Sequence, residues 1–177
     1  MGTDFAQTLA YGQAGESAIA MWFRNKGYSV LPIYEKILDD NKGPRLFLAT
    51  ETRVAPDLFV FKGGRALWIE AKHKTAFSWH RLTERWVTGI DIRHYLDYCV
   101  VDDSTPWPVW LLFLHRGGTA KDSPESPSGL FGNELRVLRE CENHRHENWG
   151  TSGMVYWAKD KLIRMADVTD CAPPPRS

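Results

Sequence analysis

The sequence predicts an α/β fold in which a central mixed β-sheet, built around an antiparallel hairpin, is flanked by helices. Residues 13–26 place apolar side chains at helical spacing. Two apolar runs, 58–61 and 66–69, are joined by a short turn containing two glycines, which indicates a hairpin. Residues 109–114 are continuously apolar, as in a strand buried on both faces. The chain has 177 residues, and we expect one domain over 1–170.

The first part of the chain predicts a helix, a strand and a turn before the hairpin. The helix over 13–26 ends at Gly27, a residue common just past the end of a helix. A strand over 28–33 follows it. The segment 39–44, which combines Asp, Asn, Gly and Pro, predicts a turn, and 45–50 predicts a further short strand.

After the hairpin the pattern alternates between helices and strands. Residues 90–101 carry apolar side chains at helical spacing, so we expect a second flanking helix. The Gly-, Ser- and Pro-rich segment 117–129 predicts a loop. Residues 131–146 predict a charged helix, and 154–158 a last strand. We expect 171–177, with three consecutive prolines, to be a disordered tail.

The ends of the predicted hairpin carry two acids and a lysine. Asp57 opens the first strand, whereas Glu70 and Lys72 close the second; residues two apart on a strand share a face. Two carboxylates at one place suit a hard divalent cation, and a neighbouring lysine can hold a nucleophile or developing negative charge. These parts suit hydrolysis of a phosphodiester. The alternative is that Asp57 caps a turn and the other two form an edge-strand charge pair.

These residues resemble the motif of the PD-(D/E)xK nuclease superfamily, particularly its Holliday-junction-resolvase-like and RecB-like branches. Asp57, preceded by a proline, and Glu70-Ala71-Lys72 match that motif. The resemblance implies a restriction-endonuclease-like core and a Mg²⁺ or Mn²⁺ ion held by Asp57, Glu70 and the Ala71 carbonyl. It also implies that Lys72 positions or helps deprotonate the attacking water. Glu16, on the first helix, matches an acid that often adds a third carboxylate, although a backbone or arginine hydrogen bond is the alternative for it.

The segment 91–95 occupies the place where many members of these branches carry Gln-x-x-x-Tyr on a helix. Asp91 stands where the glutamine is expected, so the resemblance departs from the family pattern at this position. Tyr95 matches the tyrosine. We therefore expect this helix either to line the site or to be a surface helix.

A basic and aromatic segment follows the hairpin and suits a nucleic-acid partner. Residues 62–93 contain seven Lys or Arg and three acids, a local excess of four positive charges in a chain of zero net charge. Tryptophans interleaved with arginines can stack on unpaired bases, although core packing and scattered surface charge are equally open interpretations. The side chains we expect to contact DNA are Lys74, Trp79, Arg81, Arg85, Arg93 and Tyr95.

Composition narrows the protein class and the compartment. Hydrophobic content of 43% and charged content of 25% are typical of a globular protein, and zero net charge argues against a bulk polycation. Three widely spaced cysteines predict a reducing compartment without disulfides. We find no long apolar run or signal pattern and expect a cytoplasmic protein without membrane contact. A zinc site at Cys141, His144 and His146 is disfavoured because no second ligand cluster exists.

The sequence therefore predicts a metal-dependent deoxyribonuclease. We expect branched or single-stranded DNA as substrate, in recombination, repair or phage DNA processing, and a possible homodimer. The alternative is a nucleic-acid-binding module that keeps the nuclease fold but is non-catalytic or depends on a partner protein to cut.

Overall fold

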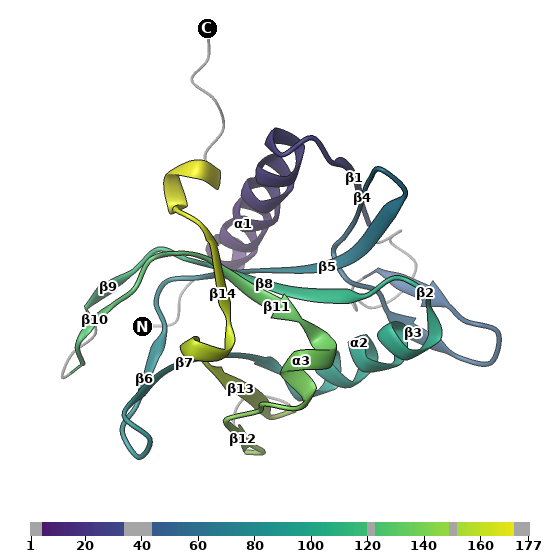
Figure 1. Ribbon diagram of the computed structural model, residues 1–177. Helices are drawn as coiled ribbons and strands as arrows, with labels where there is room; N and C mark the ends of the chain where they lie inside the picture. The colour runs from purple at the N-terminus through teal and green to yellow at the C-terminus, as the bar shows by residue number, and fades with distance from the viewer. Residues whose placement is uncertain (1–4, 34–43, 120–122, 149–151, 172–177) are drawn as a thin grey trace, which may run out of the picture.

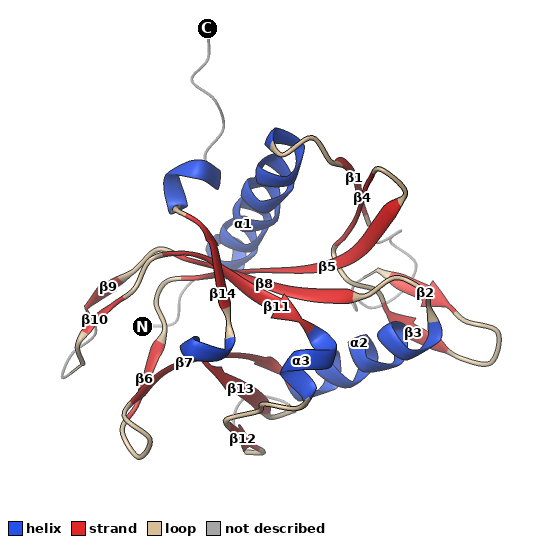
Figure 2. Cartoon of the chain, viewed as in Figure 1, coloured by secondary structure: helices blue, strands red, loops and turns tan. Residues whose placement is uncertain are grey.

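The computed structural model describes residues 5–33, 44–119, 123–148 and 152–171, with side chains described from residue 14 onward. Figure 1 shows the order of the elements and Figure 2 their type. In chain order the elements are α1 (Phe5–Asn25), β1 (Ser29–Pro32), β2 (Arg45–Phe47), β3 (Thr52–Val54), β4 (Leu58–Lys62), β5 (Arg65–Lys74), β6 (Ser78–His80), β7 (Arg85–Asp91), α2 (Ile92–Ser104), β8 (Val109–His115), β9 (Gly118–Thr119), β10 (Glu125–Ser126), β11 (Gly129–Glu134), α3 (Leu135–Arg139), β12 (His144–His146), β13 (Met154–Ala158), η1 (Lys159–Lys161), β14 (Ile163–Ala166) and η2 (Val168–Cys171).

A six-stranded mixed sheet forms the centre of the molecule. Its order is β1-β4-β5-β8-β11-β14, with β5 and β8 parallel and every other neighbouring pair antiparallel. The predicted hairpin is β4–β5, in which Leu58 pairs with Ile69 and Lys62 with Arg65. The turn between them contains Gly63 and Gly64, both with positive φ, a conformation that glycine adopts without steric cost. The predicted mixed sheet around an antiparallel hairpin is confirmed.

Each face of this sheet carries its own apolar core. On one face α1 packs Ile19, Trp22 and Phe23 against side chains of β4, β5, β8 and β11. The other face is covered by α2, α3 and a second, four-stranded antiparallel sheet of order β12-β13-β7-β6 (Figures 1 and 2). The continuous apolar run of β8 follows from this arrangement, because Leu112 faces α1 while Leu111 faces the second layer.

The helix predicted over 131–146 is wrong. The segment contains most of β11, the short helix α3 and the strand β12. Phe131 lies in one core and Leu130 in the other, an alternation that belongs to a strand buried on both faces. A Cβ at Gly132 would lie 2.5 Å from the backbone oxygen of Leu111, so close pairing with β8 requires glycine there.

Several boundaries also differ from the prediction. The first helix begins at Phe5, and the predicted loop 117–129 contains the paired strands β9 and β10. The predicted strand 45–50 is shortened to β2, which pairs with β3. Cys171, expected in the tail, ends η2 and is buried, whereas 172–177 and most of the predicted turn 39–44 lie outside the described residues.

None of the described helices is both long enough and apolar enough to cross a membrane.

Candidate functional site

The site lies where β5 runs past the start of β4. Residues Arg65 to Ile69 of β5 pair with β4, whereas the last part of β5, from Glu70 onward, has β8 as its strand neighbour. Asp57 immediately precedes β4 and lies beside that part of β5, where its Oδ2 accepts a hydrogen bond of 2.9 Å from the Ala71 N–H. The Lys72 ammonium forms an ion pair with Glu70 Oε1 on the same face of β5. The register of the hairpin therefore brings Asp57, Glu70 and Lys72 together.

Helix α1 adds a third carboxylate to this group. The helix crosses β5 at Gly15, where a Cβ would lie 2.2 Å from His73 Cβ, so only glycine permits this close approach. The next residue, Glu16, lies close enough to Asp57 and Lys72 for their charges to act on it. Burial, and then the Asp57 charge, raise the pKa of Glu16 to about 7.

Two of the carboxylates are held in an unfavourable environment. Glu70 is 0% exposed, and its Oε1 is ion-paired with Lys72. Burial, followed by repulsion from Glu70, raises the pKa of Asp57 to about 7. Two neighbouring buried carboxylates are costly unless cations compensate both charges, and Lys72 supplies one such charge. The geometry therefore favours a positive charge at this position beyond that of Lys72.

The donor set suits Mg²⁺ or Mn²⁺, which prefer oxygen ligands and commonly use one or two carboxylates together with water. Glu70, whose Oε1 is paired with Lys72, and Asp57, with one oxygen left over from its bond to Ala71, are the side chains that fit such an ion. Among the described residues, no three His, Cys, Asp or Glu side chains are already gathered as a ligand set. The Ala71 carbonyl and Glu16 as ligands stay predictions.

Helix α2 presents two side chains to the site that the sequence prediction missed. Tyr98 is buried, and burial together with the charges of Glu70 and Asp57 holds its pKa well above the ordinary value. His94, one helical turn earlier, is half-buried, and burial followed by the Lys72 charge lowers its pKa. Both residues lie in the predicted helix 90–101, and their spacing of four places them on one helix face, so this pair was readable in the sequence.

The residues predicted from the segment 91–95 do not reach this group. Asp91 is the N-cap of α2, and its side chain accepts a hydrogen bond from the Arg93 N–H. Tyr95 is 3% exposed and its hydroxyl donates a 2.6 Å hydrogen bond to Glu142 on the side of the second layer. Arg93 has an exposed side chain. The inward-facing pair therefore lies three residues later than the resemblance placed it.

The remaining predicted DNA contacts are divided between two places. Lys74 lies on the same strand face as Lys72, and burial followed by the Lys72 charge lowers its pKa to about 8. Trp79 and Trp86 pack edge to face at 5.0 Å between β6 and β7, in the second sheet. Arg85 forms an ion pair of 3.4 Å with Asp160 in the same region.

The turn between β6 and β7 carries Arg81, whose side chain is exposed. This turn belongs to the second sheet, so Arg81 is not part of the group formed by Asp57, Glu70 and Lys72.

A cleft of about 620 Å³ opens beside the acids. Glu16 and Asp57 line it, together with residues of α1 and β1 that include Met21 and Arg24. The acids therefore border a space large enough to admit part of a substrate.

No family model matches the chain, and no curated protein matches it. Solved structures do match. One is Hjc, a Holliday junction resolvase from the archaeal hyperthermophile Archaeoglobus fulgidus, with a TM-score of 0.50, 9% identity, and coverage of 85% of this chain and 90% of that one. Another is D212, a nuclease from a fusselovirus, with a TM-score of 0.42, 11% identity, and coverage of 96% and 91%. The chain thus has a resolvase-like nuclease fold, as the sequence predicted.

Proposed function

We propose that this chain is a Mg²⁺- or Mn²⁺-dependent deoxyribonuclease that hydrolyses phosphodiester bonds. The observation that carries the proposal is the pair of largely buried carboxylates, Glu70 and Asp57, which share the single cation Lys72 at the start of β4. Lys72 offsets one of the two carboxylate charges, so a purely structural role would leave the other without a cation, whereas a metal ion would compensate it. The resolvase-like fold supports the same function.

The residues of the site divide into ligands and a positioning cation. Asp57 and Glu70 would hold the ion, with Glu16 and the Ala71 carbonyl completing its shell. When bound, such an ion lowers the pKa of a water and stabilises charge on a phosphoryl oxygen. Lys72 retains 31% side-chain exposure, and its acidic neighbours raise its pKa, so it stays protonated at neutral pH. It therefore orients the attacking water and contacts the phosphate, and it does not remove the proton.

We propose branched or single-stranded DNA as the substrate. The fold shared with Hjc, described as a Holliday junction resolvase, supports a branched substrate, and a homodimer would place two such sites on one junction. Lys74, on the same strand face as Lys72, would contact the backbone beside the cleaved bond. Three free cysteines support a reducing, cytoplasmic location.

The test is a cleavage assay with wild type, Glu70→Ala and Glu51→Ala, the last a control at a partly exposed acid paired with Arg53. Labelled single-stranded, duplex, flapped and four-way-junction DNA would be incubated with Mg²⁺, Mn²⁺ or EDTA. We expect metal-dependent cutting by wild type and Glu51→Ala, and none by Glu70→Ala. Equal cutting by Glu70→Ala would refute the assignment. No cutting by wild type on any substrate would favour a binding module or a partner-dependent subunit.

A further inference from the structure

The face of the β4–β5 hairpin that carries the acids continues into exposed aromatic side chains. Because alternate residues share a face, Asp57, Phe59 and Phe61 lie in one row on β4, and Glu70 and Trp68 lie in the row beside it on β5. At roughly 3.4 Å per residue, Phe59 lies about 7 Å and Phe61 about 14 Å from Asp57 along the strand direction. Trp68 is 8% and Glu70 0% exposed, so the row between them lies in the core, and the exposed rings lie at the turn end of the same hairpin face.

These rings are exposed although they are large and apolar. Phe61 is 45% exposed and Trp107, from the loop after α2, is 40% exposed. Trp107 packs edge to face on Phe59 at 5.1 Å, and Phe59 in turn contacts Trp68 at 4.7 Å. A pocket of about 360 Å³ is lined by Phe59, Phe61 and Trp107, together with Arg65. An exposed apolar patch of this kind indicates a binding surface.

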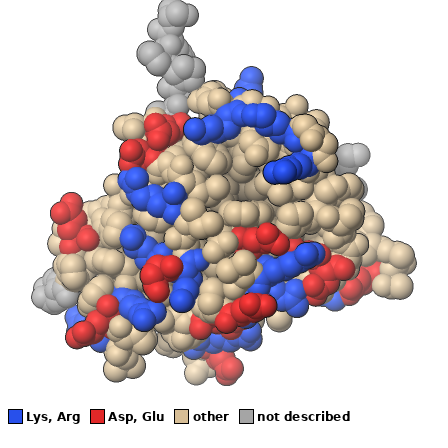
Figure 3. All heavy atoms as spheres, in the orientation of Figure 1, with Lys and Arg blue, Asp and Glu red and all other residues tan. Residues whose placement is uncertain are grey.

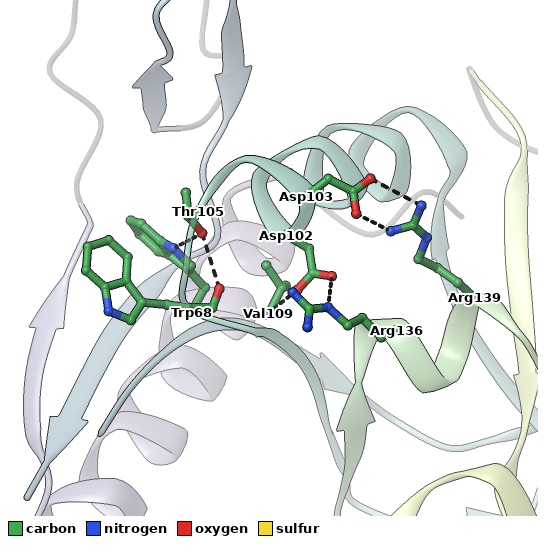
Figure 4. A network of polar contacts seen from close by, with 8 residues as sticks. Trp68, Asp102, Asp103, Thr105, Val109, Arg136 and Arg139 are labelled. Atoms are coloured by element: carbon green, nitrogen blue, oxygen red, sulfur yellow. Dashed lines mark hydrogen bonds and ion pairs between the residues drawn. The ribbon is translucent and has the colours of Figure 1, made fainter. Parts of the chain in front are cut away.

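The loop that carries Trp107 is fixed in place. The Trp68 indole N–H donates to Thr105 Oγ1 at 3.2 Å, and that hydroxyl donates to the Trp107 carbonyl at 3.2 Å (Figure 4). On the other side of the loop, buried Asp102 accepts the Val109 N–H at 2.9 Å (Figure 4). The ring is thus presented on a preorganised loop, which lowers the entropy lost on binding.

The charge around the pocket fits an anionic partner. The described residues that line it include one cation, Arg65, and no acid. In Figure 3, blue side chains gather where Figure 1 places the tip of the β4–β5 hairpin and the end of α1, with an uncharged stretch below them. Aromatic rings beside cations are the combination that binds unpaired bases of a nucleic acid strand. A purely apolar partner surface would leave Arg65 uncompensated.

We infer that Phe59, Phe61, Trp107 and Arg65 form a subsite that stacks an unpaired nucleobase of the DNA strand cut at Asp57 and Glu70, away from the cleaved bond. This inference rests on the proposed nuclease function, since the strand that the subsite binds is the one cut at these acids. The rings hold the base and Arg65 contacts a phosphate. The subsite gives the enzyme its preference for unpaired DNA.

The affinity for DNA, measured under conditions in which no cleavage occurs, tests the inference. Fluorescence anisotropy would measure the affinity of labelled oligothymidine in EDTA for wild type, Phe61→Ala, Phe61→Trp and the control Phe47→Ala, which removes a 78% exposed ring from β2. Stacking on one ring predicts a loss of roughly 5-fold or more for Phe61→Ala. Phe61→Trp should retain or tighten binding, and Phe47→Ala should leave it unchanged. Circular dichroism would establish that each variant is folded.

An oligonucleotide with abasic sites separates stacking from phosphate attraction. Wild type should bind the abasic strand as weakly as Phe61→Ala binds the intact strand. For Phe61→Ala, removing the bases should cause no further loss of affinity. Equal affinity of wild type for intact and abasic strands would overturn the inference, as would unchanged affinity in folded Phe61→Ala. If Phe61→Ala converts a dimer to a monomer in sedimentation without changing oligonucleotide affinity, the patch is an interface between copies and the inference is overturned.

The experiments distinguish a refutation of the stacking subsite from a refutation of the proposed nuclease function. Metal-dependent cutting that Glu70→Ala abolishes, combined with base-independent binding, refutes the subsite alone. Base-dependent binding without cutting under any condition refutes the nuclease and keeps the stacking site.

Discussion

Asp57 should make the stability of the metal-free protein depend on pH. Its carboxyl is taken from water beside a second, fully buried carboxylate, Glu70, so its charged form is disfavoured in the folded state. The unfolded chain lacks both effects. The difference between the two states appears as a change in the free energy of unfolding with pH.

The sign and size of this change follow from the two pKa values of Asp57. The ordinary pKa is 3.8 and the folded-state pKa is about 7, so between these values the folded state binds more protons than the unfolded state. The free energy of unfolding therefore falls as pH rises through this range. Since each unit of pKa corresponds to about 1.4 kcal/mol, charged Asp57 lowers stability at pH 8 by up to about 4 kcal/mol. Glu16 contributes in the same direction.

Urea unfolding in EDTA between pH 4 and pH 8, with wild type and Asp57→Asn, measures this effect. The variant keeps an oxygen that can accept the Ala71 N–H but carries no charge. We expect it to exceed wild type in stability at pH 8 by up to about 4 kcal/mol, and the two to converge near pH 4. A difference that stays constant across this range, or a variant less stable than wild type at pH 8, would show that Asp57 is not under electrostatic strain.

Three further predictions use other parts of the structure. Mg²⁺ at pH 7.5 should raise the thermal unfolding midpoint of wild type but not of Glu70→Gln in scanning fluorimetry; equal rises would contradict metal binding at this acid. Gly15→Ala should lower the free energy of unfolding in urea by roughly 1–3 kcal/mol and reduce cleavage, because its Cβ would lie 2.2 Å from a β5 side chain. An unchanged free energy and cleavage rate would show that α1 can shift freely. Arg136→Ala removes a 3.1 Å partner of fully buried Asp102 (Figure 4) and should lower the free energy of unfolding by roughly 1–3 kcal/mol. Arg139→Ala breaks an exposed ion pair with Asp103 and should lower it by less than about 1 kcal/mol. Equal losses for the two variants would contradict this difference in burial.

The sequence was most informative where one local pattern decides the structure. The β4–β5 hairpin has apolar runs of matched length around a glycine turn, so its register, and with it the meeting of Asp57 with Glu70 and Lys72, follows from neighbouring residues. The apolar run of β8 predicted a strand buried on both faces because no surface element has that composition.

Prediction from the sequence was wrong at 131–146, where the same composition suits a strand and a helix. Leu135 and Leu138 do lie at helical spacing, but only in the short helix α3; the residues before them pair with β8 because Gly132 allows close approach there. That approach is a contact with a strand about twenty residues away in the chain, and no local pattern reports it. The strands β6 and β7 were likewise unpredicted, because β7 joins this sheet by pairing with β13, a strand more than sixty residues later in the chain.

The sequence by itself determined that Asp57, Glu70 and Lys72 meet, since a tight hairpin fixes their pairing within sixteen residues of chain, from 57 to 72. Only the tertiary structure decided their environment. Packing of α1 at Gly15 places Glu16 beside Asp57, and packing of α2 turns His94 and Tyr98 toward the site while Tyr95 faces the second layer. The physical reason is that burial and electrostatic repulsion depend on every element within a few ångströms, and those elements come from distant parts of the chain.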